Sequence, residues 1–84
     1  MVAFSFTNAA ERQLQKFDPQ TQQRILKKLS ELKTHPSLLT VLEPVSNLEP
    51  ATHRLRIGEY RLLVCLEEGM CVVLKIAHRR EVYQ

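Results

Sequence analysis

The side chains of this sequence that could do chemistry are arginine, histidine and tyrosine, and they gather in its last third. Residues 53–84 carry five arginines and one lysine, whereas residues 1–52 carry four lysines and two arginines. Arginine presents a planar fork of N–H donors that matches the geometry of phosphate, whereas lysine is a strongly hydrated point charge. An anionic partner is therefore expected on the second part of the chain.

Three of these arginines are predicted to share one face of a β-hairpin. Residues 53–57 alternate polar and apolar side chains, and Gly58-Glu59 suits a two-residue type II′ turn. Arg56 then faces Arg61, and Arg54 lies on the same side of the sheet. Because like charges directly across a strand pair repel, two interpretations stay open: solvated arginines neutralised by nearby acids, or an anion site.

The C-terminal segment supplies a second cluster, His78-Arg79-Arg80-Glu81-Val82-Tyr83. Histidine exchanges protons near neutral pH, and tyrosine can do so when its pKa is shifted. The alternative is a frayed basic tail, although Val82 and Tyr83 are of kinds that usually pack. Arginine, histidine and tyrosine together could stabilise a phosphorane-like transition state and move protons without metal. Cleavage of RNA through its own 2′-OH needs only those functions.

Other chemistries lack their motifs. The chain has only two glycines and no P-loop, GxGxxG or GxSxG pattern. Cys65 and Cys71 lie in apolar segments and are interpreted as core residues, and no histidines are spaced for a metal. We therefore expect no metal and no cofactor. Without a signal peptide pattern or an apolar run of about 20 residues, a cytoplasmic protein with no membrane contact is expected.

Hydrophobic spacing predicts the elements that must position these residues. Apolar side chains alternate over residues 2–6, which indicates a strand. Thr7 is a candidate N-cap for a helix over 8–17. Asp18-Pro19 starts a second helix that runs to about residue 34, where His35-Pro36 ends it.

The rest of the chain is predicted to be β-structure after an irregular stretch. Three prolines interrupt residues 36–52 and exclude a long helix or a central strand there. A short strand or a helical turn near residues 38–42 is still compatible with this stretch. Strands are predicted over 53–57, 60–66 and 71–77, the last of them central because it is apolar on both faces. The expected fold is one α+β domain over 1–84, in which an N-terminal strand and a three-stranded antiparallel meander form one twisted sheet with both helices on one face.

Two motifs resemble those of a known family. The segment Arg54 to Val64 resembles the R-x-R-x-G-x-Y-R core of the RelE/ParE toxin superfamily, and Ile76 to Tyr83 resembles the H-R-x-x-V-Y close of its RelE-type members. The opening pattern of Phe6, Ala10, Leu14 and Lys16 also matches. The resemblance spans nearly all of the chain and implies a RelE-like fold.

The resemblance implies the toxin of a type II toxin–antitoxin system. Such a toxin is a ribosome-dependent endoribonuclease, an mRNA interferase that cleaves mRNA in the A site by 2′-OH attack and inhibits translation. Its implied partners are the ribosome with mRNA and a cognate antitoxin that neutralises it. Operator DNA would be reached only through the antitoxin complex.

Site residues carried over from the resemblance are catalytic or RNA-binding. Arg61 would hold the scissile phosphate, and Arg79 would stabilise developing charge or protonate the leaving 5′-oxygen. Tyr83 would stack on the nucleotide and assist proton transfer. Arg54 falls where relatives have a basic residue that helps to activate the 2′-OH. The residues that would contact RNA phosphates are Arg56 and Arg80.

The sequence departs from the family where a general base is needed. Thr52 stands where some relatives have a lysine, and position 54 is arginine. Arginine cannot act as a base because its pKa stays above about 12. Histidine as a residue type can exchange protons near neutral pH, and His78 adjoins Arg79, so we hypothesise that His78 supplies the missing base.

Two other functions compete with the ribonuclease. The ParE branch shares the fold but poisons DNA gyrase, and the His78 to Tyr83 motif argues against it. A non-catalytic module that binds nucleic acid or antitoxin is the second. An antitoxin would cover the arginines or displace the tail with a segment that folds on binding. Apolar residues of the irregular stretch either belong to that docking surface or pack under the sheet: Leu38, Leu39, Val41 and Val45.

Overall fold

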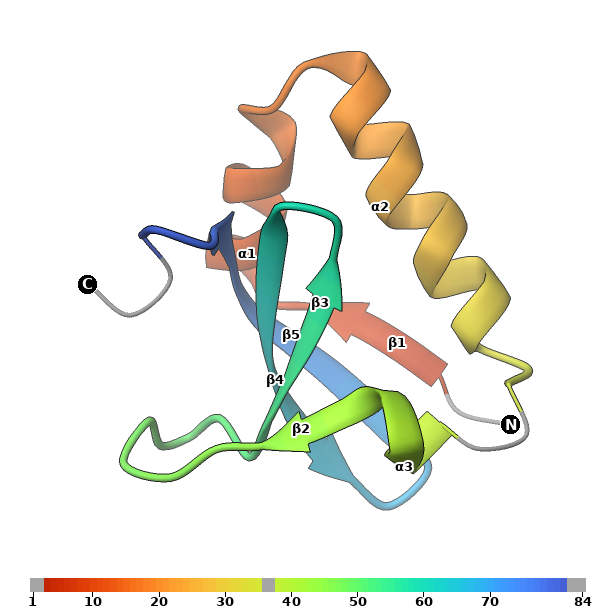
Figure 1. The fold of residues 1–84 in the computed structure, drawn as a ribbon, viewed down its shortest axis with the longest axis vertical. Coiled ribbons are helices and arrows are strands. Elements are labelled where there is room, and N and C mark those ends of the chain that lie inside the picture. Colours follow the sequence, from red (N-terminus) through yellow and green to blue (C-terminus); the bar gives the residue numbers. More distant parts are fainter. Residues whose placement is uncertain (1–2, 36–37, 82–84) are drawn as a thin grey trace.

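Two helices pack on one face of a five-stranded sheet in the computed structural model, which describes residues 3–35 and 38–81 (Figure 1). The sheet order is β1-β5-β4-β3-β2, with β1 parallel to β5 and the other neighbours antiparallel. The elements are β1 (Ala3–Phe6), α1 (Asn8–Gln15), α2 (Pro19–Leu32), α3 (Leu38–Val41), β2 (Leu42–Pro44), β3 (His53–Ile57), β4 (Tyr60–Glu67) and β5 (Met70–His78). The predicted α+β class is confirmed, and β2 is a strand that the prediction lacked.

Side-chain caps begin both long helices where the sequence predicts. The Thr7 hydroxyl accepts a hydrogen bond from the Ala10 amide at 3.1 Å, and the Asp18 carboxylate accepts one from Thr21 at 3.3 Å. Each helix ends two residues before its predicted boundary. After α1 the chain must turn extended at Asp18 to cap α2, and the amide of Lys16 closes the last turn of α1 on the Gln13 carbonyl at 3.2 Å.

The main core lies between the helices and the sheet. Ile25 of α2 belongs to the same core as Leu62 and Val64 of β4, and all three side chains are fully enclosed. Leu38 and Val41 pack against this same core. These two residues therefore pack within the domain, whereas the side chain of Leu39 lies outside what the structure describes.

A smaller core covers part of the opposite face of the sheet. Leu63 of β4 is buried there together with Ala51, and Val45 and Leu48 pack against them. Side chains of the β2–β3 connection thus cover this part of the sheet. Of the two alternatives for Val45, an antitoxin-docking surface or packing under the sheet, the structure shows the second.

A β-bulge in β5 decides which way the end of this strand faces. Leu63 pairs with Lys75 but Val64 pairs with Val73, so Leu74 is an extra residue. The alternation of β5 therefore shifts by one residue beyond the bulge. His78 pairs with Tyr60 and shares the helix-covered side, whereas unbroken alternation from Val73 would have placed it on the other.

Candidate active site

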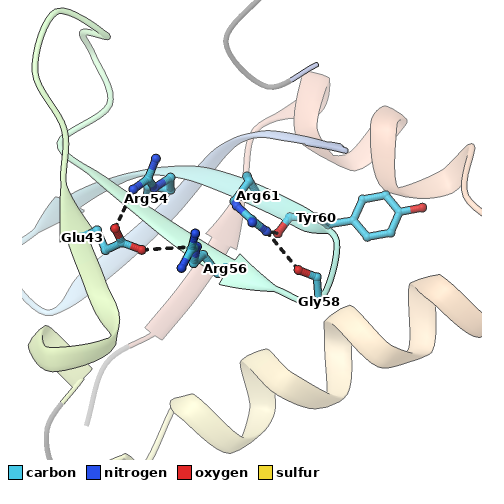
Figure 2. A network of polar contacts seen from close by, with 6 residues as sticks. All are labelled: Glu43, Arg54, Arg56, Gly58, Tyr60 and Arg61. Atoms are coloured by element: carbon cyan, nitrogen blue, oxygen red, sulfur yellow. Dashed lines mark hydrogen bonds and ion pairs between the residues drawn. The ribbon is translucent and has the colours of Figure 1, made fainter. Parts of the chain in front are cut away.

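Three arginines and one glutamate form a cluster on the face of the sheet opposite the helices, which we call the arginine face: Arg54 and Arg56 of β3, Arg61 of β4 and Glu43 of β2 (Figure 2). Arg56 pairs with Arg61 across the hairpin, and Glu43 pairs with Arg54. The predicted pairing of Arg56 with Arg61, with Arg54 on the same face, is confirmed. Turn length and pleating alone were sufficient to bring the arginines together.

Glu43 neutralises part of the arginine face. One of its carboxylate oxygens lies 2.5 Å from Nη2 of Arg54, and the other lies 3.6 Å from Nε of Arg56. The hydrogen bond from Arg54, aided by the charges of Arg56 and Arg61, holds the pKa of Glu43 below its ordinary value. One carboxylate thus serves two arginines and leaves the cluster positive.

Sequence reasoning missed Glu43 because β2 was not predicted. Its pairing with Arg54 joins strands that an irregular stretch separates, and no local spacing encodes such a partner. The available signal was the alternation of Leu42 and Glu43 before Pro44, which is typical of a short edge strand.

Arg61 differs from its neighbours because backbone carbonyls hold it. Its Nη1 donates to the carbonyls of Gly58 and Tyr60, both at 3.0 Å. Within the described residues, Arg61 has no carboxylate within 4.0 Å, so Nε and Nη2 keep their donors for another acceptor. That pair of donors is the geometry with which arginine grips a phosphate bidentately.

The turn that carries this carbonyl depends on glycine, which yields a matched pair of variants. Gly58 and Gly69 have φ of +58° and +71°, and a Cβ would meet nothing within 4 Å at either. Alanine at either position is expected to cost about 1–2 kcal/mol of unfolding free energy through backbone strain alone. Of the two variants, only Gly58→Ala strains the turn whose carbonyl accepts a hydrogen bond from Arg61, so only that variant should also weaken the binding of inorganic phosphate. Chemical denaturation and phosphate titration of both variants test this; equal phosphate binding by both would contradict it.

The hairpin tip also fastens the end of β5. The Arg79 amide donates to the Glu59 carbonyl at 2.8 Å, and the Glu59 carboxylate lies 3.2 Å from Nε of Arg79 and 3.4 Å from Nε2 of His78. Arg79 and Arg80 are exposed. The predicted site residue Tyr83 lies outside the described residues.

His78 belongs to an aromatic cluster on the helix side of the sheet. Its ring meets Tyr60 edge-on at 5.8 Å between centroids, and Tyr60 lies 4.8 Å from Phe17. These rings line a cleft of about 560 Å³ beside Lys16 and Glu81. The structure therefore brings Arg54, Arg56 and Arg61 together on one face and places His78 on the other.

Neither cysteine has the properties of a nucleophile. Burial raises the pKa of the Cys71 thiol to about 11, and burial also raises that of Cys65. Across residues 3–35 and 38–81, no three His, Cys, Asp or Glu side chains converge as metal ligands would. In the same part of the chain, no helix has the length and apolar character needed to cross a bilayer.

Two carboxylates make the stability of the fold depend on acid pH. The pKa values of Asp18, through its hydrogen bonds with Thr21, and of Glu43 lie below their ordinary values of 3.8 and 4.5. Their stabilisation is therefore complete above about pH 5 and is lost as pH falls through the lowered pKa values. We expect the denaturant midpoint to fall between pH 5 and pH 3, and to fall less in Glu43→Gln. An equal fall in that variant would contradict the assignment.

Solved structures of the same fold define the class of this protein. A chain of the RelBE2 toxin–antitoxin complex from Mycobacterium tuberculosis aligns with 27% identity and a TM-score of 0.75, covering 93% of this chain and 98% of that chain. The isolated RelE toxin of Escherichia coli aligns with 18% identity and a TM-score of 0.70, covering 99% and 92%. A RelE–RelB complex from Pyrococcus horikoshii aligns with 16% identity and a TM-score of 0.73, covering 96% and 98%. The fold is thus that of RelE-like toxins.

The sequence assigns the chain more narrowly. Residues 4–83 match the ParE toxin of type II toxin–antitoxin systems, parDE, and the chain belongs to this family. The predicted membership of the RelE/ParE superfamily is confirmed. No curated protein matches the sequence.

Proposed function

We propose that this toxin is a metal-independent endoribonuclease that cuts mRNA on the ribosome. The observation that carries the proposal is the arginine face, which places Arg61 and the Glu43 carboxylate on the same side of the sheet, with two Arg61 donors not bonded to the protein. A phosphate held by Arg61 would therefore share this face with both a charge stabiliser and a proton acceptor. Those are two of the functions that cleavage by an internal 2′-OH requires.

The proposed reaction is an in-line displacement at phosphorus. The 2′-oxygen forms a bond to the phosphate while the bond to the 5′-oxygen breaks, which leaves a 2′,3′-cyclic phosphate and a 5′-hydroxyl. The base takes the 2′-OH proton, and an acid protonates the leaving 5′-oxygen. Arg61 would bind the non-bridging oxygens, whose charge grows in the transition state. We assign the leaving-group side to Arg79 and nucleotide stacking to Tyr83.

Glu43 is our candidate for the general base. Arg54 cannot accept a proton, whereas Glu43 lies on the same face and is ionised at neutral pH. A phosphate bound to Arg54 and Arg56 would compete with the Glu43 carboxylate for these two arginines. The weaker ion pairs would raise the pKa of Glu43, which makes Glu43 a better base when substrate is present. His78, hypothesised for this role from the sequence, lies on the opposite side of the sheet. The role of His78 stays a prediction that the variants in the Discussion separate from Glu43.

The proposed partners follow from the openness of the site. An exposed face positions a flexible RNA poorly, so we assign substrate alignment to the ribosome. Arg56 and Arg80 would contact RNA phosphates. A cognate antitoxin is proposed as the neutralising partner, covering the arginine face with acidic residues and carrying the contact with operator DNA. Two of the three solved structures described above are toxin–antitoxin complexes, which supports this partner.

Gyrase inhibition is the second candidate, because the matched family is that of ParE toxins. Inducible expression followed by primer extension on cellular mRNA separates the two. Cuts confined to translated frames are expected for the ribonuclease. Intact mRNA with accumulating DNA breaks would assign the protein to gyrase instead. Neither effect, with RNA binding retained, would indicate a non-catalytic module.

A further inference from the structure

A basic groove of about 410 Å³ lies between α2 and the tip of the β3–β4 hairpin. Four cations and one carboxylate line it together with a short piece of strand: Arg24, Lys27, Lys28, Glu31, Arg56, Ile57 and Gly58. Figure 2 shows α2, the pale yellow helix, running past the turn at Gly58. The groove adjoins the arginine face and is separate from the aromatic cleft.

The helical cations of the groove have no internal explanation. Arg24, Lys27 and Lys28 are exposed and lie three and four residues apart, so they project from one side of α2. None of them has a carboxylate within 4.0 Å among the described residues. They also lie outside the last turn of α2, where cations would offset the helix dipole. Their charges are therefore not engaged in an ion pair within the described residues and are available to a ligand.

Arg56 connects the groove to the arginine face. Its side chain lines the groove, is 62% exposed, and reaches Glu43 only at 3.6 Å. β2 pairs with β3 only from His53 to Leu55, so in the described chain no strand covers the outer edge at Arg56 and Ile57. A chain of phosphates lying on the arginine face could pass over this open edge into the groove.

The lining favours a nucleic acid over a protein. Ile57 is the one apolar side chain of the groove and is only 4% exposed, so an amphipathic helix would find no apolar floor. The open edge spans two residues, which is too short for strand addition. The groove has four cations against the one carboxylate of Glu31, and this excess of positive charge beside an arginine fork suits a phosphate backbone.

We propose that the basic groove binds the backbone of the same RNA strand whose scissile phosphate lies on the arginine face. The identity of that strand rests on the proposed function, whereas the affinity of the groove for RNA does not. The groove supplies binding without touching the reacting phosphate. Its loss should therefore raise KM while kcat stays unchanged.

The test compares two double variants of equal charge in the full chain. Lys27→Ala/Lys28→Ala alters the groove, and Arg12→Ala/Lys33→Ala removes two cations outside it. The probe is a 12-nucleotide single-stranded RNA with 2′-O-methyl groups, which cannot be cut, followed by fluorescence anisotropy at several salt concentrations. The groove variant should bind about tenfold more weakly, with the salt slope reduced by roughly 1.4, and the control should bind as the wild type does. Equal losses in both variants would overturn the proposal.

Further arms separate the sources of phosphate and the class of partner. If the groove variant keeps its affinity for the oligonucleotide but loses affinity for empty ribosomes, the strand assignment is overturned in favour of ribosomal RNA. A polyglutamate peptide of matched charge that binds more tightly than the RNA, through Lys27 and Lys28, would overturn it in favour of a protein. The binding measurement does not depend on cleavage, because the probe cannot be cut. If the wild type failed to cleave mRNA in the primer-extension experiment, the proposed function would be rejected, but the measured affinity of the groove for RNA would still hold. Alanine is a strong helix former, so both variants should fold, as thermal melts can verify.

Discussion

Replacing Arg61 with alanine is expected to reduce the cleavage rate by about 10²–10³-fold, the cost of removing one preorganised donor group from a developing oxyanion. The bonds from Nη1 to the carbonyls of Gly58 and Tyr60 hold the guanidinium before substrate arrives, so little reorganisation is needed at the moment of reaction. Single-turnover cleavage of a ribosome-bound mRNA, followed by primer extension, measures this rate. The loss should appear in kcat and also in KM, because Arg61 holds the phosphate anion in the ground state and meets its additional charge in the transition state.

Two companions to Arg61→Ala make the result interpretable. Arg61→Lys keeps the charge but cannot bond both carbonyls and also grip phosphate with two parallel donors, so it should remain severely impaired. Arg12→Ala removes a cation of α1 far along the chain and should cleave as the wild type does. Because Arg61 is not part of either core, its alanine variant should keep the denaturation midpoint within experimental error. Cleavage by Arg61→Ala within twofold of wild type would rule out its proposed role.

Glu43→Gln is expected to lower kcat by about 10²–10⁴-fold, the range that a positioned general base contributes. The amide keeps the shape of the side chain but accepts no proton at neutral pH. It also leaves Arg54 and Arg56 without their carboxylate, which should strengthen RNA binding. A fall in kcat together with an unchanged or lower KM is therefore the expected signature. A merely structural role would instead weaken binding and catalysis together.

His78→Ala is the direct comparison for the base. If Glu43 is the base, the acid limb of the pH profile of kcat should vanish in Glu43→Gln and persist in His78→Ala. Retained cleavage in Glu43→Gln with loss in His78→Ala would return the role to His78. The histidine variant also removes the edge-on contact with Tyr60 and the contact with Glu59, so its stability should be measured in parallel.

Local features of the sequence were sufficient to predict the elements and the arginine face. Thr7 and Asp18 start the helices through bonds to residues three positions ahead, so the information lies within one helical turn. The two-residue turn at Gly58-Glu59 dictates which β3 and β4 residues pair, and pleating then places their side chains. Each of these relations joins residues that are close along the chain.

Tertiary pairing decided the parts of the site that the sequence could not. Glu43 meets Arg54 because β2 adds to the edge of β3, and that pairing depends on a connection without regular pattern. His78 faces the helices because a bulge at Leu74 lets Val73 and Ile76 both enter the core. No sequence pattern near His78 predicts this bulge. The side chains able to bind phosphate or transfer protons could thus be identified from the sequence. Which of them share a face was decided by strand addition and by one extra residue in a strand, since both arise from packing over the whole sheet.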